Sequence, residues 1–119
     1  MKILIIEDNN MVVKTLQFRL AKDGYDLTIA KDGREAMNIL EEGTFDLVLT
    51  DLMLPFITGN ELITHIKKHT PQTPIIVLST STQEDIIMDA FDMGVDDFIT
   101  KPFSPNELSL RIKRLLKRG

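Results

Sequence analysis

The sequence alternates five times between a short apolar run and a segment with helical periodicity. The apolar runs lie at residues 3–6, 25–30, 45–50, 75–78 and 98–100. Strands that alternate with helices pair in parallel through right-handed crossovers, so that helices cover both faces of one sheet. A closed eight-stranded barrel would need about twice this length. We therefore predict one α/β domain over residues 1–119, a doubly wound, flavodoxin-like (βα)5 fold whose five-stranded parallel sheet has the order 2-1-3-4-5.

Polar residues and glycines mark the ends of the predicted helices. A Ser, Thr or Asp followed three residues later by Glu can satisfy the free amides of a first helical turn. That spacing occurs at Asp32–Glu35, Thr58–Glu61, Ser81–Glu84 and Ser104–Glu107. Gly24, Gly43 and Gly94 are expected to end the first, second and fourth helices. Apolar residues at helical spacing predict the buried faces: Val13, Leu16 and Leu20 in the first helix, Leu62, Ile63 and Ile66 in the third, Ile86, Ala90 and Met93 in the fourth, and Leu108, Ile112, Leu115 and Leu116 in the fifth.

The composition of the chain indicates which kinds of partner it can bind and where in the cell it is expected. The chain has 18 acidic and 14 basic side chains and a formal net charge of -4, so we expect no nucleic-acid binding through its overall field. It has no cysteine, which excludes disulfides and thiolate metal sites. No apolar run is long enough to cross a bilayer and no signal-peptide pattern follows Met1, so we expect a cytoplasmic protein that does not contact membranes. Basic residues that can complement a helix dipole crowd the C-terminus: Arg111, Lys113, Arg114, Lys117 and Arg118.

Polar residues that could react or bind a ligand follow four of the five predicted strands. Glu7 and Asp8 follow the first strand, Asp51 the third, Ser79 the fourth and Lys101 the fifth. Taken alone, Asp51 would more simply cap a turn or a helix. In the predicted sheet, however, all these positions meet at the carboxyl edge, at the switch point between strands one and three. Three carboxylates so close together would repel one another unless a cation joins them, and Mg²⁺ prefers such oxygen ligands.

This arrangement predicts a role in phosphoryl transfer for each residue. Asp51 would be the nucleophile, since a carboxylate can attack phosphorus and form an aspartyl phosphate. Asp8, and Glu7 partly through water, would hold Mg²⁺, which neutralises charge on the transferring group. Ser79 would hydrogen-bond a phosphoryl oxygen and Lys101 would form an ion pair with it. Because phosphorylation adds negative charge at Asp51, the loops that carry Ser79 and Lys101 are expected to shift.

Several stretches together resemble the receiver domain of response regulators in two-component signal transduction, over essentially the whole chain. They are Glu7-Asp8, DLMLP with Gly59 eight residues after Asp51, PIIVLS ending at Ser79, GVDDFITKPF and SPNEL. The resemblance implies transfer of a phosphoryl group from the phosphohistidine of a sensor histidine kinase, with Mg²⁺, and slow hydrolysis afterwards. The implied roles are Glu7 and Asp8 as the acidic pair, Asp51 as phosphoacceptor, the backbone carbonyl of Met53 as the remaining metal ligand, Ser79 as the switch hydroxyl, Phe98 as the switch aromatic, and Lys101 as the site lysine, joined to Pro102 by a cis peptide bond.

Some positions depart from the commonest receiver pattern. Phe98 stands where many members carry Tyr, so it offers no phenol for a switch hydrogen bond. Thr80 replaces a small Ala, which narrows access to the phosphoryl group. Met53 and Ser81 flank the site without an acid or amide that could place a water. We therefore predict a long-lived phosphoryl state, which a half-life of seconds at neutral pH would contradict.

GVDDF and the SPNEL helix resemble, in particular, the receivers of winged-helix transcription regulators. That resemblance implies control of transcription through a covalently linked DNA-binding domain, and a phosphorylation-promoted homodimer through helix four, strand five and helix five. Asp96, Asp97, Glu107 and Arg111 fit such a charged face, whereas Ile87 and Asp89 lie where basic residues are usual.

Two other functions are compatible with this type of fold. An Asp-nucleophile, Mg²⁺-dependent phosphatase would carry a second aspartate two residues after Asp51, where Met53 lies. A flavin-binding protein would need a phosphate-cradling loop after the first strand, where the sequence EDNN is electrostatically opposite. We therefore expect a signalling domain that catalyses only its own phosphorylation and dephosphorylation. His65 and His69 lie four residues apart on the third helix, but without a matched carboxylate a solvated surface is favoured over a metal site.

Overall fold

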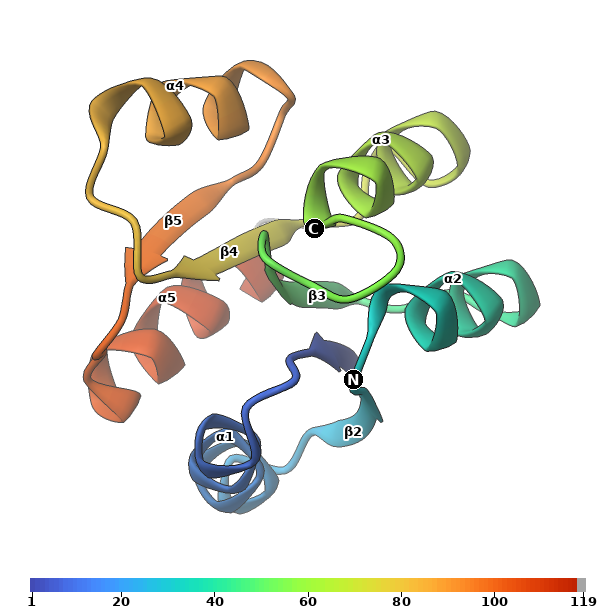
Figure 1. Cartoon of the computed structure of the whole chain (residues 1–119). Helices are drawn as coiled ribbons and strands as arrows, with labels where there is room; N and C mark the ends of the chain where they lie inside the picture. The colour runs from blue at the N-terminus through green and yellow to red at the C-terminus, as the bar shows by residue number, and fades with distance from the viewer. Residues whose placement is uncertain (118–119) are drawn as a thin grey trace.

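The computed structural model describes residues 1–117, which contain a five-stranded parallel sheet (Figure 1). The strands are β1 (Lys2–Ile6), β2 (Asp26–Ala30), β3 (Leu47–Asp51), β4 (Ile75–Ser79) and β5 (Asp97–Thr100). Their order is β2-β1-β3-β4-β5, and every neighbouring pair is parallel. The predicted fold class and strand order are confirmed. β3 lies at the centre, where Thr50 pairs with Ile6 of β1 and Asp51 pairs with Leu78 of β4.

In the described part of the chain, five helices cover the sheet in two layers (Figure 1). One face carries α1 (Asn10–Lys22) and α5 (Pro105–Lys117), and the other carries α2 (Gly33–Glu42), α3 (Gly59–His69) and α4 (Glu84–Asp92). Successive side chains of a strand point to opposite faces, so each central strand contributes side chains to the cores on both sides of the sheet. Ile3 and Ile5 pack with α1 and α5, whereas Leu4 and Ile6 pack with the other three helices. The central strands are therefore almost continuously apolar.

Three of the four predicted helix caps are confirmed. The side chains of Asp32, Thr58 and Ser104 accept hydrogen bonds from the amides of Glu35, Glu61 and Glu107, at 2.8, 3.2 and 3.2 Å respectively. At the other end of α1 and beyond α4, Gly24 and Gly94 have φ of 91° and 101°, a conformation that glycine adopts without strain.

The predicted cap of α4 is wrong. The helix begins at Glu84, after Gln83, whose side chain makes no capping hydrogen bond. Ser81 Oγ instead accepts a hydrogen bond from the Gln83 amide at 3.2 Å, and the Ser81 amide donates to Ser79 Oγ at 3.1 Å. Short-range bonds within the Ser and Thr run after β4 thus compete with helix capping.

The predicted buried faces hold with three exceptions. Ile86, Met93 and Leu116 are only half-buried, whereas the other residues named for these faces are buried. Of the basic C-terminal residues, Arg114 and Lys117 lie in the last turn of α5, and Arg118 lies outside the described residues. Among residues 1–117, no helix has the length and apolar character that a membrane span requires.

Candidate functional site

Three carboxylates meet at the carboxyl edge of the sheet. Glu7 directly follows β1, and Asp51 is the last residue of β3, which pairs with β1. One oxygen each of Glu7, Asp8 and Asp51 lie within 4.8 Å of one another. Glu7 and Asp51 are buried, whereas Asp8 is exposed. The structure thus brings together the three acids that the sequence places at this edge, and we call them the acidic cluster.

Lys101 joins two members of the acidic cluster. Its Nζ lies 2.6 Å from Glu7 Oε1 and 2.8 Å from Asp51 Oδ2. All three side chains are nearly inaccessible to solvent, so these ion pairs are weakly screened. Lys101 follows β5, and its peptide bond to Pro102 is cis, as the resemblance implies. One ammonium against three carboxylates leaves an excess of negative charge, which makes the cluster a candidate site for a divalent cation.

Burial and hydrogen bonding oppose each other at this ion-pair network. Burial raises the pKa of Glu7 above its ordinary value, although hydrogen bonds from Lys101 and from the Asn9 amide favour the carboxylate. Burial of Lys101 favours the neutral amine, but hydrogen bonds to Asp51 and Glu7 outweigh this effect and raise the pKa of Lys101. Lys101 is therefore an ammonium at neutral pH.

The backbone after Asp51 holds the second oxygen of its carboxylate. The Met53 amide donates a hydrogen bond to Asp51 Oδ1 at 3.0 Å, and the Met53 side chain is exposed. Gly59 begins α3, and its amide donates to the Leu52 carbonyl at 3.1 Å. A Cβ at Gly59 would lie 2.7 Å from Leu52 Cα, so only glycine lets α3 begin directly against the segment that carries Asp51.

Phe56, in the same loop, has a conformation that the sequence analysis did not identify. Its φ of 70° is the only positive value at a non-glycine residue among residues 1–117, and it costs an L-residue about 1–2 kcal/mol. The Ile57 amide donates to the Pro55 carbonyl at 2.9 Å and closes a three-residue turn around Phe56. Phe56 is 68% exposed, and the Arg34 guanidinium lies 4.2 Å from the centroid of its ring. An exposed cation–π contact of this kind stabilises by about 0.5–1 kcal/mol. No sequence signal indicated this turn, because phenylalanine rarely adopts positive φ.

The two residues predicted to switch lie on the neighbouring strands. Ser79 is the last residue of β4 and is buried, and its Oγ accepts a hydrogen bond from the Ser81 amide at 3.1 Å. Phe98, on β5, is half-buried and packs against the core beneath α2, α3 and α4. Ser79 is thus bonded to the backbone of the segment that leads into α4, and Phe98 packs on the face of the sheet that carries α4.

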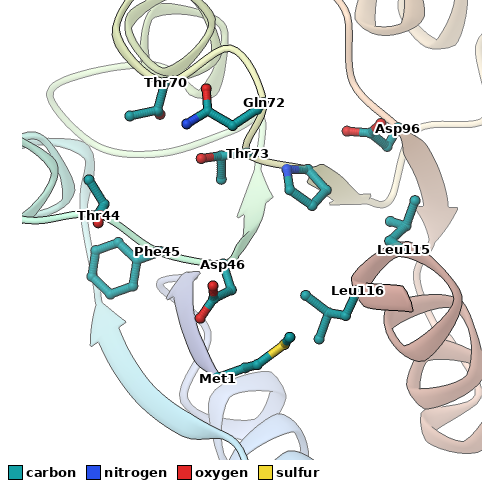
Figure 2. Close-up of a pocket in the computed structure, with 11 residues that line it drawn as sticks. Met1, Thr44, Phe45, Asp46, Thr70, Gln72, Thr73, Asp96, Leu115 and Leu116 are labelled. Atoms are coloured by element: carbon teal, nitrogen blue, oxygen red, sulfur yellow. The ribbon is translucent and has the colours of Figure 1, made fainter. Parts of the chain in front are cut away.

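A separate hollow of about 530 Å³ lies at the opposite, amino edge of the sheet (Figure 2). Asp46 and Asp96 are among the side chains that Figure 2 shows around it. Both carboxylates already bond strand amides: Asp46 accepts from Lys2 at 2.7 Å, and Asp96 accepts from Ile75 at 2.9 Å. These hydrogen bonds to the strands explain why Asp46 and Asp96 are aspartates, so the acidic cluster at the other edge remains the candidate site.

The histidine pair on α3 forms a local contact. The rings of His65 and His69 stack with their centroids 4.2 Å apart, and His69 Nδ1 lies 2.9 Å from the His65 carbonyl oxygen. Within residues 1–117, the group of three potential metal-ligating side chains is the acidic cluster.

The chain is similar to known proteins over nearly its whole length. A family model described as the response regulator receiver domain matches residues 3–113. The chain belongs to the response-regulator receiver family. The receiver domain is 37% identical over 118 residues to the alkaline phosphatase synthesis transcriptional regulatory protein PhoP of Bacillus subtilis, and 38% identical over 117 residues to the transcriptional regulatory protein SrrA of Staphylococcus aureus. These alignments cover 99% and 98% of this chain but 49% and 48% of the relatives. The receiver domain therefore spans about half the length of the curated relatives it matches.

A solved relative agrees with this assignment. The structure of the Francisella response regulator 1452 receiver domain matches with a TM-score of 0.91 and 32% identity, over 98% of this chain and 97% of that chain. The family inferred from the sequence motifs is confirmed. This receiver domain is a signalling domain of the two-component type, with the function of a phosphorylation switch. The phosphatase and flavin alternatives are not favoured by these relatives.

Proposed function

We propose that the receiver domain accepts a phosphoryl group on Asp51 from the phosphohistidine of a sensor histidine kinase. The observation that carries this proposal is the convergence of Glu7, Asp8 and Asp51 within 4.8 Å, with Lys101 bonded to two of them. A carboxylate oxygen of Asp51 would form a bond to phosphorus while the phosphorus–nitrogen bond of the donor breaks. The electron pair of that bond stays on the donor imidazole, which then takes up a proton.

The acidic cluster would hold Mg²⁺ during this transfer. Its ligands would be the carboxylates of Glu7, Asp8 and Asp51 and the backbone carbonyl of Met53. The excess of carboxylates over ammonium in the cluster supports a hard divalent cation, which prefers oxygen ligands. Bound Mg²⁺ supplies positive charge that stabilises the transferring phosphoryl group.

Lys101 and Ser79 would respond to the phosphoryl group. Lys101 lies 2.8 Å from Asp51 Oδ2 and would transfer its ion pair to a phosphoryl oxygen. Ser79 Oγ accepts its bond from the Ser81 amide, so the hydroxyl can donate to a second phosphoryl oxygen. Movement of Ser79 toward Asp51 would draw with it the segment that leads from β4 into α4. Phe98, which packs in the α4 layer, would then rearrange and carry the change to the face formed by α4, β5 and α5.

This α4/β5/α5 face would act on an output in a longer protein. PhoP and SrrA are named transcriptional regulators, and about half of each lies outside the alignment, which supports control of transcription through a linked DNA-binding domain. A hollow of about 260 Å³ opens on this face between apolar side chains that include Phe91 and Phe103. At its edge, Arg111 bonds Asp97 Oδ1 at 2.9 Å and Glu107 Oε1 at 2.6 Å. A hollow that combines aromatic side chains with polar and charged ones suits a homodimer contact. Sedimentation velocity with and without acetyl phosphate measures whether phosphorylation promotes it.

Intact-mass spectrometry with a small-molecule donor tests the phosphoacceptor. Incubation of the parent chain with acetyl phosphate and Mg²⁺ should add the mass of one phosphoryl group, and EDTA should prevent the gain. Asp51→Asn should gain nothing under the same conditions, because an amide does not attack phosphorus. An equal gain in Asp51→Asn would exclude Asp51 as the acceptor.

A further inference from the structure

The loop between β3 and α3 presents an aromatic side chain that the fold of the free domain does not need. Phe56 has a φ of 70°, and the residue is 68% exposed. The backbone cost of this conformation exceeds the stabilisation from the contact with Arg34, and glycine would adopt it without strain. The exposed ring therefore adds little to the stability of the free domain. Residues kept in rare backbone conformations by a well-fixed surrounding structure cluster at binding and catalytic sites.

The surrounding structure fixes this turn. The Pro55 carbonyl accepts hydrogen bonds from the amides of Ile57, at 2.9 Å, and Gly33, at 3.2 Å. A Cβ on Gly33 would lie 2.7 Å from the Ile57 carbonyl carbon, so the first turn of α2 packs directly on the loop backbone. The Ile57 side chain packs against the core beneath it. Phe56 is therefore presented from a rigid support rather than from a free loop.

The loop lies close enough to Asp51 to be covered by a protein interface of standard size centred on this residue. Phe56 is three residues before Gly59, which packs on the Asp51 backbone, so its Cα lies within about 14 Å of Asp51. An interface of standard size covers about 800 Å² on each partner, equivalent to a disc of about 16 Å radius. A protein donor must bring phosphorus into bonding contact with Asp51, and a disc centred there includes Phe56.

We propose that Phe56, together with Arg34, is the anchor through which the phosphodonor kinase binds this receiver domain. This inference rests on the proposed function described above. The kinase surface would offer an apolar pocket for the ring next to its phosphohistidine, with a carboxylate at the rim for the exposed Arg34 guanidinium. Aromatic residues and arginine are the side chains that most often dominate the binding energy of protein interfaces. A small donor such as acetyl phosphate has no surface that could contact the ring.

Two donors and a substitution that preserves the turn test this inference. Phe56→Gly removes the ring and relieves the positive φ, but glycine also makes the unfolded chain more flexible. The two effects largely offset each other, so its unfolding midpoint in urea should stay close to that of the parent chain. With an autophosphorylated histidine kinase as donor, kcat/KM for transfer to Phe56→Gly should fall by about tenfold or more, mainly through KM. With acetyl phosphate and Mg²⁺, the rate should stay within about twofold of the parent rate. Arg34→Gln should lower kinase transfer by about threefold to fivefold and leave the acetyl phosphate rate unchanged.

Leu110→Ala is the matched control. Leu110 is an equally exposed apolar side chain, 67% accessible, but it lies on α5, which covers the other face of the sheet. This variant should match the parent with both donors.

The kinase used is the one that phosphorylates the parent chain fastest among purified histidine kinases of the source organism. Kinase transfer to Phe56→Gly within twofold of the parent rate overturns the inference, and so does acetyl phosphate labelling of a parent that accepts from no kinase. An equal fall with both donors also overturns it, since the ring would then act on the chemistry. A Phe56→Gly chain that is not fully folded under the assay conditions contradicts it, because the ring would then be structural. A parent chain that acetyl phosphate does not label refutes the proposed function instead.

Discussion

Gly59 connects the stability of the receiver domain to the position of Asp51, the proposed phosphoacceptor. A Cβ at this residue would lie 2.7 Å from Leu52 Cα and 3.2 Å from the carbonyl carbon of Asp51, and it would lie closest to the Asp51 carbonyl oxygen. Non-bonded carbon atoms are normally separated by about 3.5–4.0 Å. In Gly59→Ala, the start of α3 and the segment at residues 51–52 must therefore move apart by about 1 Å.

The free-energy change combines two opposing effects. Forcing an additional methyl group into a packed site costs about 1–3 kcal/mol. Alanine favours a helix over glycine by at most about 1 kcal/mol, and by less at Gly59 because it is the first helical residue. We therefore expect Gly59→Ala to lower the free energy of unfolding by about 1–2 kcal/mol.

The functional effect should be larger than the loss of stability. The backbone that must move carries the Asp51 carboxylate, whose Oδ2 lies 2.8 Å from Lys101 Nζ. A displacement of about 1 Å in a reacting group can reduce a rate by about 100-fold. We expect the acetyl phosphate reaction of Gly59→Ala to be slower by at least about tenfold under conditions in which the protein is fully folded.

Urea denaturation and intact-mass time courses measure these two effects, with Gly43→Ala as the control. Gly43 is also a helix-terminal glycine, but it has an extended φ of -161°, and a Cβ there would meet nothing within 4 Å. The control should stay within about 0.5 kcal/mol of the parent and react at the parent rate. A Gly59→Ala variant as stable and as reactive as Gly43→Ala would refute the argument that this close approach positions Asp51.

Three further predictions concern the acidic cluster. Free Mg²⁺ at ten times its measured dissociation constant should raise the unfolding free energy of the parent by about 1.4 kcal/mol in urea titrations, and Asp8→Asn should lose most of that gain. Lys101→Met should lower the unfolding free energy by about 3 kcal/mol near neutral pH without Mg²⁺, because it leaves the buried Glu7 and Asp51 carboxylates without their cation. That loss should shrink in acid as Glu7 takes up a proton, and equal losses at both pH values would contradict the explanation. Glu7→Gln should stabilise the Mg²⁺-free domain near neutral pH, because burial raises the pKa of Glu7 in the folded state. The stability that protonated Glu7 contributes is present below its unfolded-state pKa and is lost as the pH rises through its folded-state pKa. Uncharged glutamine avoids that loss, so the unfolding free energies of Glu7→Gln and the parent chain should converge in acid.

The strand order and the convergence of the acidic residues could both be predicted from the amino-acid sequence. Apolar runs and helical periods are local patterns, and their fivefold alternation allows few ways to bury both faces of a parallel sheet. Caps such as Asp32 and Ser104 depend on residues three positions away, so they too could be predicted. Once the strand order is given, the carboxyl ends of β1 and β3 must be neighbours, which is why Glu7, Asp8 and Asp51 could be expected to converge.

The hydrogen-bond partners of these residues depend on how distant segments pack, and local patterns did not predict them. Ser81 could cap α4 or bond within its own turn, and two arrangements of similar local energy are distinguished by how the chain leaves β4. The pairing of Lys101 with both Glu7 and Asp51 joins residues 94 and 50 positions apart, a separation that no local pattern encodes. The positive φ of Phe56 contradicts the preference of its residue type and persists because Gly33, Ile57 and Gly59 fix the backbone around it. Local preferences choose elements, but contacts between distant segments hold a residue in a conformation that its own chemistry disfavours.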